Sequence, residues 1–185
     1  RTVGPQLEGL RDGPVVAVTA TATPRVQDDI VAQLGIPHAA RFIRGFRRDN
    51  LAIEVVETTP SARSGVVARI LADPARRPAI VYAPTRRETE SLAGELGATL
   101  PAAAYHAGLP TAERERVQRA FADDELEAVV ATVAFGMGVD KADIRTVVHT
   151  ALPGTVEAYY QEVGRAGRDG LPSRVVLLWS WADRR

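Results

Sequence analysis

Short apolar runs alternate along the chain with longer amphipathic stretches. The runs have the length of buried strands, and Gly, Pro or polar residues bound them. On this pattern we predict strands over residues 14–19, 51–58, 79–82, 102–105, 127–131, 144–149 and 173–179.

Between these runs, apolar residues recur every three or four positions, as they do on one face of a helix. Thr23 followed by Pro24 predicts the start of a helix, and Gly35 predicts its end. Thr85 and Glu88 have the Thr-x-x-Glu spacing of a capping box, which predicts a second helix start. Further helices are predicted with Ser61 as N-cap, over about residues 110–121, and after Pro153-Gly154.

Strands that alternate with helices predict a parallel sheet with right-handed crossovers and helices on both faces. The fold class is therefore α/β. The pattern breaks and the density of charge rises over residues 38–50. We predict a boundary there, with residues 1–40 forming a separate segment and residues 41–185 forming the main domain.

Composition narrows the range of functions. The 185 residues hold 23 basic and 23 acidic side chains, and every basic one except Lys141 is arginine. A net charge of zero argues against a generally basic coat for nucleic acid, so such contacts would come from local arginines and backbone groups. No cysteine is present, which excludes disulfides and thiolate metal sites and is compatible with a reducing compartment such as the cytosol.

No membrane segment is predicted. The chain has no run of about 18 or more apolar residues, the length that a transmembrane helix needs. Residues 1–10 also lack the apolar core of a signal peptide.

Candidate binding residues follow the predicted strands. In parallel sheets, ligands bind beyond the carboxyl ends of the strands. The segments in that position are rich in small, hydroxylated, glycine and arginine residues: 19–23, 83–86, 106–108, 132–138 and 161–169. Hydroxyls and exposed backbone N–H groups bind phosphate oxygens, so these segments predict a groove that follows a nucleic-acid backbone.

Together these segments resemble the RecQ family of ATP-dependent DNA helicases. The matching blocks, in the family's order and spacing, are VTATAT (18–23), IVYAPTR (80–86), AYHAGL (104–109), VATVAFGMGVDK (130–141) and YYQEVGRAGRDGLP (159–172). The resemblance covers nearly the whole chain. It implies a RecA-like parallel sheet flanked by helices, in which residues 1–40 are the tail of a first motor domain and residues 41–185 are the second.

The resemblance implies that Arg168 is an arginine finger that reaches the γ-phosphate of ATP, with Arg165 assisting it. If the helix that carries them continues, two residues three positions apart share a face and can converge on one anion. The alternative is that Arg168 is a solvated side chain or a partner of Asp169 at the helix end.

Three further residues belong to the nucleotide side of the resemblance. Gln161 is implied to couple the nucleotide and DNA sites, although a plain surface glutamine is a close alternative. Asp140 is implied to hold Arg168 or to contact the ribose, and a structural salt bridge is nearly as well supported. Gly138 lies in a Gly-x-Gly turn that would present its backbone to phosphate.

A second group of residues is implied to contact the DNA backbone. The group comprises Thr85, Arg86, His106, Ala107, Gly108 and Thr132. Thr85 also completes a helix cap, and Thr132 has the alternative of capping a strand end. His106 has the alternative of a packed core histidine. No metal role is predicted for His106, because the other histidines, His38 and His149, are far away in sequence.

A shorter stretch resembles the interdomain Phe-x-Arg-Pro-Asn-Leu sequence of the family. Phe46, Arg48, Asn50 and Leu51 match it, and Asp49 stands where the family often has proline. This substitution predicts a less rigid connection.

The implied function is that of the second motor domain of a 3′–5′ DNA helicase. Its implied partners are single-stranded and partly duplex DNA and the first RecA-like domain of the same protein. ATP with Mg²⁺ would be held mainly by that upstream domain, which carries the family's P-loop. Lys141, the only lysine, does not lie in a P-loop frame, so we predict that this chain alone does not hydrolyse ATP. Two alternatives stay open: a translocase or RNA-acting relative, and a nucleic-acid-binding module without motor activity.

Overall fold

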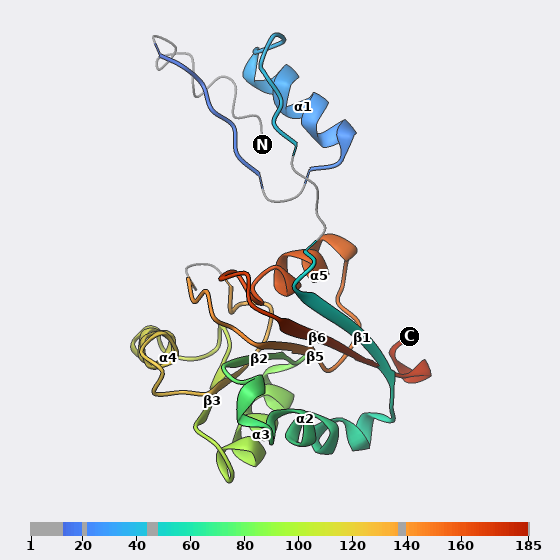
Figure 1. Ribbon diagram of the computed structural model, residues 1–185, viewed down its shortest axis with the longest axis vertical. Helices are drawn as coiled ribbons and strands as arrows, with labels where there is room; N and C mark the ends of the chain where they lie inside the picture. The colour runs from blue at the N-terminus through green and yellow to red at the C-terminus, as the bar shows by residue number, and fades with distance from the viewer. Residues whose placement is uncertain (1–12, 20–21, 44–47, 137–139, 185) are drawn as a thin grey trace. The chain divides into compact units, whose positions relative to one another are not determined.

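The computed structural model describes residues 13–19, 22–43, 48–136 and 140–184, and the chain divides into two compact units, residues 1–47 and 48–185 (Figure 1). The division lies inside the stretch where the hydrophobic pattern breaks. That the first unit is the tail of a preceding motor domain stays a prediction.

The first unit contains one described helix, α1 (Pro24–Leu34). The Thr23 hydroxyl accepts a hydrogen bond from the backbone N–H of Val26 at 3.4 Å, and Gly35 ends the helix in the left-handed conformation at φ 62°. Both ends were predicted from the sequence and are confirmed, because the capping residues act locally.

The strand predicted over residues 14–19 is wrong for the described part of the first unit. Residues 14–19 are assigned no strand, and Val16 and Val18 are 82% and 90% exposed. An apolar run becomes a strand only when a neighbouring strand satisfies its backbone N–H and C=O groups. None of the described segments of this unit provides one.

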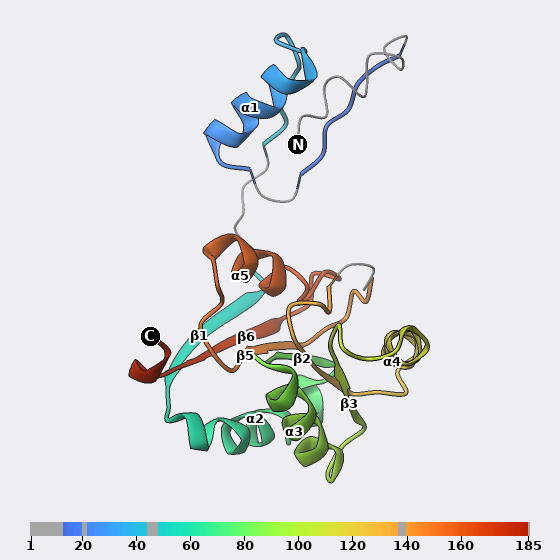
Figure 2. The same cartoon turned by 180° about the vertical axis from the view of Figure 1, so that it is seen from behind.

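The second unit is built on a six-stranded parallel sheet, which confirms the predicted fold class (Figure 2). The spatial order is β1-β6-β5-β2-β4-β3. The strands span Leu51–Glu57 (β1), Ala79–Tyr82 (β2), Ala102–Tyr105 (β3), Ala128–Ala131 (β4), Thr146–His149 (β5) and Ser173–Trp179 (β6). The order places β2 centrally, between β5 and β4.

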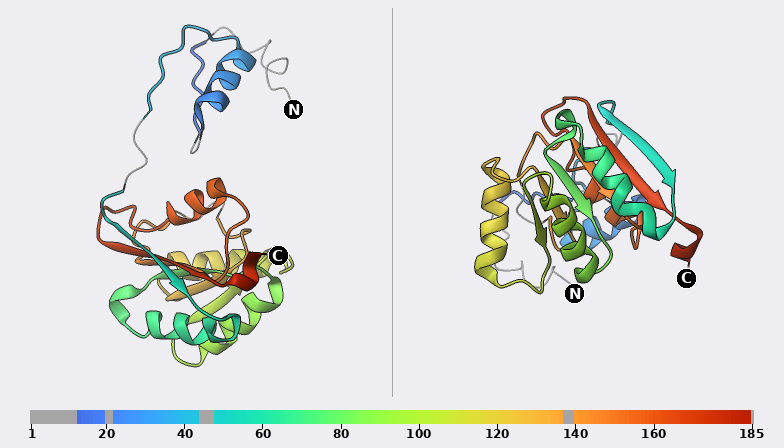
Figure 3. Two further views of the ribbon diagram at one scale, coloured as in Figure 1. Left: turned by 90° about the vertical axis from the view of Figure 1, so that its right-hand side faces the viewer. Right: turned by 90° about the horizontal axis from the view of Figure 1, so that it is seen from below.

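Helices cover both faces of this sheet (Figure 3). They span Arg63–Leu71 (α2), Arg86–Gly97 (α3), Thr111–Ala122 (α4) and Val156–Val163 (α5). Apolar residues of α2 and α3 pack on one face, and those of α4 and α5 pack on the other. Because both faces are covered, β2, β4 and β5 are buried at every position, and β5 buries Thr146 and His149 beside its two valines.

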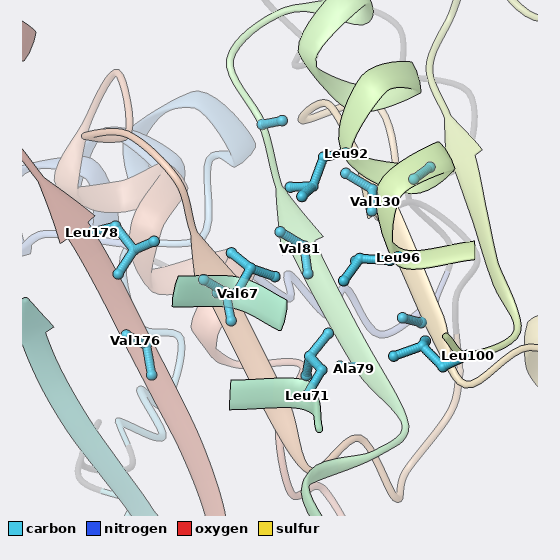
Figure 4. Close-up of a cluster of buried hydrophobic side chains, with 14 residues drawn as sticks. Val67, Leu71, Ala79, Val81, Leu92, Leu96, Leu100, Val130, Val176 and Leu178 are labelled. Carbon is cyan, nitrogen blue, oxygen red and sulfur yellow. The ribbon is translucent and has the colours of Figure 1, made fainter. Parts of the chain in front are cut away.

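The core beneath α2 and α3 is continuous (Figure 4). Val67 and Leu71 of α2 and Leu96 of α3 are nearly inaccessible and meet Val81 of β2 and Val176 of β6. Burying a side chain of this size contributes roughly 1.5–3 kcal/mol. This half of the core fixes the sheet on which the candidate site is built.

One predicted helix cap is wrong. Residues Pro60–Ala62 form a 3₁₀ turn, and α2 begins at Arg63 with no side-chain hydrogen bond from its N-cap. The Ser61 hydroxyl lies 3.3 Å from the Thr59 hydroxyl. Pro60 favours an early tight turn, which uses Ser61 inside it instead of at a cap.

Among the residues that the structure describes, no helix combines the length and the apolar character needed to cross a membrane.

Candidate functional site

Four neighbouring strands end at the same level. Tyr82 of β2 is in register with Ala131 of β4 and with His149 of β5, and Ala131 is in register with Tyr105 of β3. The segments that follow these strands therefore start side by side along one edge of the sheet, as expected for a binding edge.

The residues predicted to contact nucleic acid lie after β2, β3 and β4 on this edge. Thr85 caps α3, and its hydroxyl accepts a hydrogen bond from the N–H of Glu88 at 3.2 Å. Arg86 is exposed, and its guanidinium lies so close to Gly108 that a Cβ added there would stand 2.7 Å from Nη1 of Arg86. The structure therefore brings the β2 and β3 segments together around Arg86.

His106 is buried beneath this surface. Its side chain is 4% exposed, and Nε2 lies 2.9 Å from the Glu90 carboxylate. The Gly108 N–H donates to Nδ1 at 3.2 Å. A neutral ring with its proton on Nε2 satisfies both contacts. His106 thus shapes the turn, and Ala107 and Gly108 are the residues of this turn that the surface exposes.

Thr132 lies in the turn after β4 and is half-buried. Its N–H donates to the Tyr105 carbonyl at 3.1 Å, and its own carbonyl accepts from Phe135 N–H at 3.1 Å. With both backbone groups engaged, the hydroxyl is the group that could contact a ligand.

The two predicted arginines lie beyond the end of α5, after the neighbouring strand β5. The Thr155 hydroxyl caps the start of α5, and the helix ends at Val163. The condition that the helix continues through Arg165 and Arg168 is therefore not met. Gly167, at φ 54°, turns the chain back to the sheet, where its N–H donates to the Ile144 carbonyl at 2.9 Å.

Arg165 is anchored by backbone. Its Nη1 donates to the Gly136 carbonyl at 2.6 Å. Gly136 has no side chain in the way, whereas a Cβ there would lie 2.3 Å from Nη2 of Arg165. The Nε atom of Arg165 is buried without a hydrogen-bond partner in the described structure. The glycine therefore permits the close approach that holds this guanidinium.

Arg168 is held more loosely. Its side chain is 39% exposed, with Nη1 3.3 Å from the Asp140 carboxylate and Nε 3.5 Å from the Gly164 carbonyl. Both distances are long for charge-assisted bonds. The structure thus brings Asp140 to Arg168, as one predicted role of Asp140 requires. Asp169 pairs instead with Arg145, and that guanidinium holds the pKa of the Asp169 carboxyl below its usual range.

Both guanidiniums act on the buried end of β2. Burial raises the pKa of the Tyr82 hydroxyl to about 12, while the positive charges of Arg165 and Arg168 oppose that rise. The hydroxyl donates to the Phe135 carbonyl at 3.1 Å. The two arginines therefore converge electrostatically although they do not share a helix face.

A buried pair that was not predicted from the sequence lies beside Tyr82. His149 stacks on the Tyr82 ring with centroids 5.1 Å apart, and its Nε2 lies 2.7 Å from the Glu162 carboxylate. The histidine side chain is 2% exposed and that of the glutamate 9%. The signal for His149 was its position at the end of a predicted strand, and the signal for Glu162 was its place in the 159–172 block, but nothing in the sequence paired the two residues.

Lys141 anchors the segment that carries Asp140. Its side chain is 6% exposed, and Nζ lies 2.5 Å from Asp124 and 3.3 Å from Asp143. The same atom sits 5.7 Å from the centre of the Phe121 ring. The ammonium is therefore a fixed structural charge below the surface.

Two predicted residues receive little further definition. Gln161 lies exposed on α5, and Gly138 lies outside the described residues. Within the described ranges, no group of three His, Cys, Asp or Glu side chains could hold a metal ion. The donors offered by Arg165 and Arg168, together with the backbone turns, suit an anionic phosphate group.

A parallel sheet with helices on both faces is the arrangement of RecA-like helicase domains. Solved structures agree. A DEAD box protein from the hyperthermophile Methanococcus jannaschii matches with a TM-score of 0.69 and 26% identity, over 88% of this chain and 44% of that one. The dbp5 protein of S. cerevisiae, bound to gle1 and IP6, matches in fold with a TM-score of 0.78 and 19% identity, over 95% of this chain and 47% of that one.

The family of helicase conserved C-terminal domains matches residues 64–170, and the chain belongs to that family. Curated relatives are RecQ helicases, which confirms the predicted resemblance. The ATP-dependent DNA helicase RecQ of Bacillus subtilis is 44% identical over 94% of this chain, and that of Haemophilus influenzae is 41% identical over 96%. The mouse exonuclease/helicase WRN is 43% identical over 92%. This chain spans 29% of each bacterial relative's length and 13% of the mouse protein's.

Proposed function

We propose that this chain is the second motor domain of a RecQ-like ATP-dependent 3′–5′ DNA helicase. One observation carries the proposal. Arg165 reaches from the segment after α5 to the Gly136 carbonyl in the segment after β4, and the predicted nucleic-acid contacts follow β2, β3 and β4 at the edge where those strands end. Such an arrangement lets a single rigid domain contact both a nucleotide phosphate and a nucleic-acid backbone.

On the nucleotide side, Arg168 is the proposed finger and Arg165 its anchored neighbour. ATP with Mg²⁺, held mainly by the first motor domain, would supply the phosphoryl group that is transferred to water. Arg168 donates hydrogen bonds to that group and stabilises negative charge on it, for which its exposed and loosely held guanidinium is suited. Asp140 orients this guanidinium until the phosphate anion takes the place of the Asp140 carboxylate. Gln161 is exposed on α5, four residues before Arg165.

On the nucleic-acid side, the proposed contacts are to phosphates. Arg86 supplies the charge, the first turn of α3 and Ala107 supply N–H groups, and Thr132 supplies a hydroxyl. The buried His106 holds the Ala107–Gly108 turn through the hydrogen bond that its Nδ1 accepts from the Gly108 N–H. Contacts of this kind carry no base code, so we expect the grip to tolerate any sequence of single-stranded DNA.

The isolated chain of 185 residues is expected not to hydrolyse ATP, because no P-loop lysine is present to hold the β- and γ-phosphates. Phosphate release by the purified chain, with and without single-stranded DNA, checks this. The Arg168→Ala chain gives the background of contaminating activity. Hydrolysis clearly above that background, and sensitive to the substitution, would contradict the prediction.

Arg86→Ala in the complete helicase is expected to weaken binding of single-stranded DNA and to reduce the slope of log affinity against log salt by about 0.7, the value for one phosphate contact on a single strand. Fluorescence anisotropy over a salt series measures both quantities. Arg87→Ala is the matched control, because Arg87 is the adjacent exposed arginine of the same helix turn. Equal slopes for the two variants would remove Arg86 from the interface.

A further inference from the structure

We infer that Arg48 and Asn50 are positioning residues for Arg168. Their side chains hold the backbone of the turn that carries Arg168. The inference rests on the proposed role of Arg168 in ATP hydrolysis. Both residues precede β1, and neither lies at the carboxyl edge of the sheet. They would act through the backbone of residues 166–171.

The contacts converge on the carbonyls of one short turn. Asn50 Nδ2 donates to the Gly167 carbonyl at 2.8 Å and to the Leu171 carbonyl at 2.9 Å. Arg48 Nη2 donates to the Ala166 carbonyl at 3.2 Å and also to that of Gly167. Arg48 is itself oriented by Nε, which donates to Asn50 Oδ1 at 3.3 Å. The two side chains therefore form a single clamp.

Gly167 packs closely against this clamp. Its φ of 54° is a conformation that L side chains rarely adopt, and a Cβ there would stand 2.5 Å from Asn50 Nδ2 and 2.6 Å from Ser173 Oγ. The turn and the clamp are thus packed together without space for a side chain. Small movements of Asn50 pass directly to the Gly167 peptide.

The held peptide is adjacent to the proposed finger. Gly167 immediately precedes Arg168, so its carbonyl carbon is bonded to the Arg168 backbone nitrogen. Arg165 has its own anchor on the Gly136 carbonyl, whereas the contacts of Arg168 with other described residues are the long ones to Asp140 and Gly164. The direction of the Arg168 side chain therefore depends on the backbone that the clamp fixes.

A purely structural role explains the clamp less well. The turn is already tied to the sheet by the Gly167 N–H to the Ile144 carbonyl at 2.9 Å and by the Asp169 N–H to the Ala142 carbonyl at 3.1 Å. The pair of Arg145 and Asp169 ties it a second time. Since these bonds remain without Asn50, the clamp's separate contribution is the orientation of the 166–168 carbonyls and of the side chain beyond them.

Asn50→Asp in the complete helicase tests the inference. The substitution keeps the size of the side chain but replaces the NH2 group, which donates to two carbonyls, by one carboxylate oxygen that faces both of them. We expect DNA-stimulated kcat to fall about tenfold to a hundredfold, as a displacement near 1 Å can cause, with KM for ATP within about twofold. Asn50→Ala, which removes the donors without adding charge, is expected to lower kcat in the same direction.

Two comparisons separate positioning from stability. Arg63→Lys is the control, because Arg63 is a largely buried arginine, 13% exposed, whose partner is Asp183 and not this turn. Its kcat is expected to stay near wild type. Asn50→Asp is then combined with Arg168→Lys under single-turnover conditions. If Asn50 acts through Arg168, Asn50→Asp should lower the rate only slightly further when Arg168→Lys is already present.

The outcomes are distinct. Equal losses from Asn50→Asp with and without Arg168→Lys, or a loss of thermal midpoint with kcat unchanged, would overturn the positioning role. Wild-type turnover in Asn50→Asp, together with a strong loss of turnover in Arg168→Lys, would also overturn the positioning role. The proposed function would then still stand. Full turnover in Arg168→Lys would refute the proposed role of Arg168 itself.

Discussion

Arg168→Ala in the complete helicase is expected to lower DNA-stimulated ATP turnover about a thousandfold or more, the range seen when an arginine finger is removed. The structure places this guanidinium at 39% exposure with a 3.3 Å contact to Asp140. It is thus available to an incoming phosphate. Because the side chain contributes little to the packed core, we expect the thermal midpoint to remain near that of the wild type.

ATP turnover measured without nucleic acid, with single-stranded DNA and with single-stranded RNA checks this expectation. Arg174→Ala is the matched control, since Arg174 is 35% exposed and lies 3.2 Å from Glu54 on an outer strand of the sheet. Stimulation by RNA alone would favour an RNA-acting relative. DNA-stimulated turnover that survives Arg168→Ala would instead favour a nucleic-acid-binding role without this arginine in the motor.

Gly136→Ala is expected to have the next largest effect, an approximately hundredfold loss of kcat, as misplacement of a catalytic constellation by about 1 Å can produce. The new Cβ would stand 2.3 Å from Nη2 and 2.9 Å from Cζ of Arg165. Those atoms form the far end of a flexible side chain, so the side chain yields more easily than the fold does. Arg165 would then leave the Gly136 carbonyl to which it now donates.

Gly154→Ala provides the control for backbone restriction, because a Cβ at Gly154 meets nothing within 4 Å. Kinetics and thermal melting of both variants form the measurement. We expect Gly136→Ala to lose turnover while its midpoint stays close to that of Gly154→Ala. Normal turnover in Gly136→Ala would show that the position of Arg165 is unimportant for hydrolysis.

The strands and helix starts that depend on a single local feature of the sequence were predicted correctly. The fully buried strands β2 and β4 appear as short apolar runs, since both faces of the sheet are covered. Thr23, Thr85 and Thr155 begin helices through their own hydroxyls, and such local chemistry is visible from sequence. The strand at 14–19 was wrong because strand formation also needs a pairing partner.

The candidate site was only partly predictable. That the segments after β2, β3 and β4 share one edge was predicted from the strand–helix alternation. The order of the strands was not predicted, so the approach of Arg86 to Gly108 could not be foreseen.

The end of α5 before Arg165 was not predicted, although Gly164 directly follows its last residue. The left-handed turn at Gly167, which is held by Arg48 and Asn50, could not be foreseen. Contacts separated by more than one hundred residues leave no periodic signal in a single sequence. The roles of the site residues themselves stay predictions.

The buried ammonium of Lys141 has a consequence for covalent modification. It is the only lysine in the chain, and two aspartates enclose it at 2.5 and 3.3 Å while its side chain is 6% exposed. Acetyl and ubiquitin groups are attached to lysine amines, and the folded domain offers none at its surface. Its positive surface charge resides in guanidinium groups, which acylating enzymes do not neutralise. Whatever regulates the charge of this domain must therefore act on other residue types or on another part of the protein.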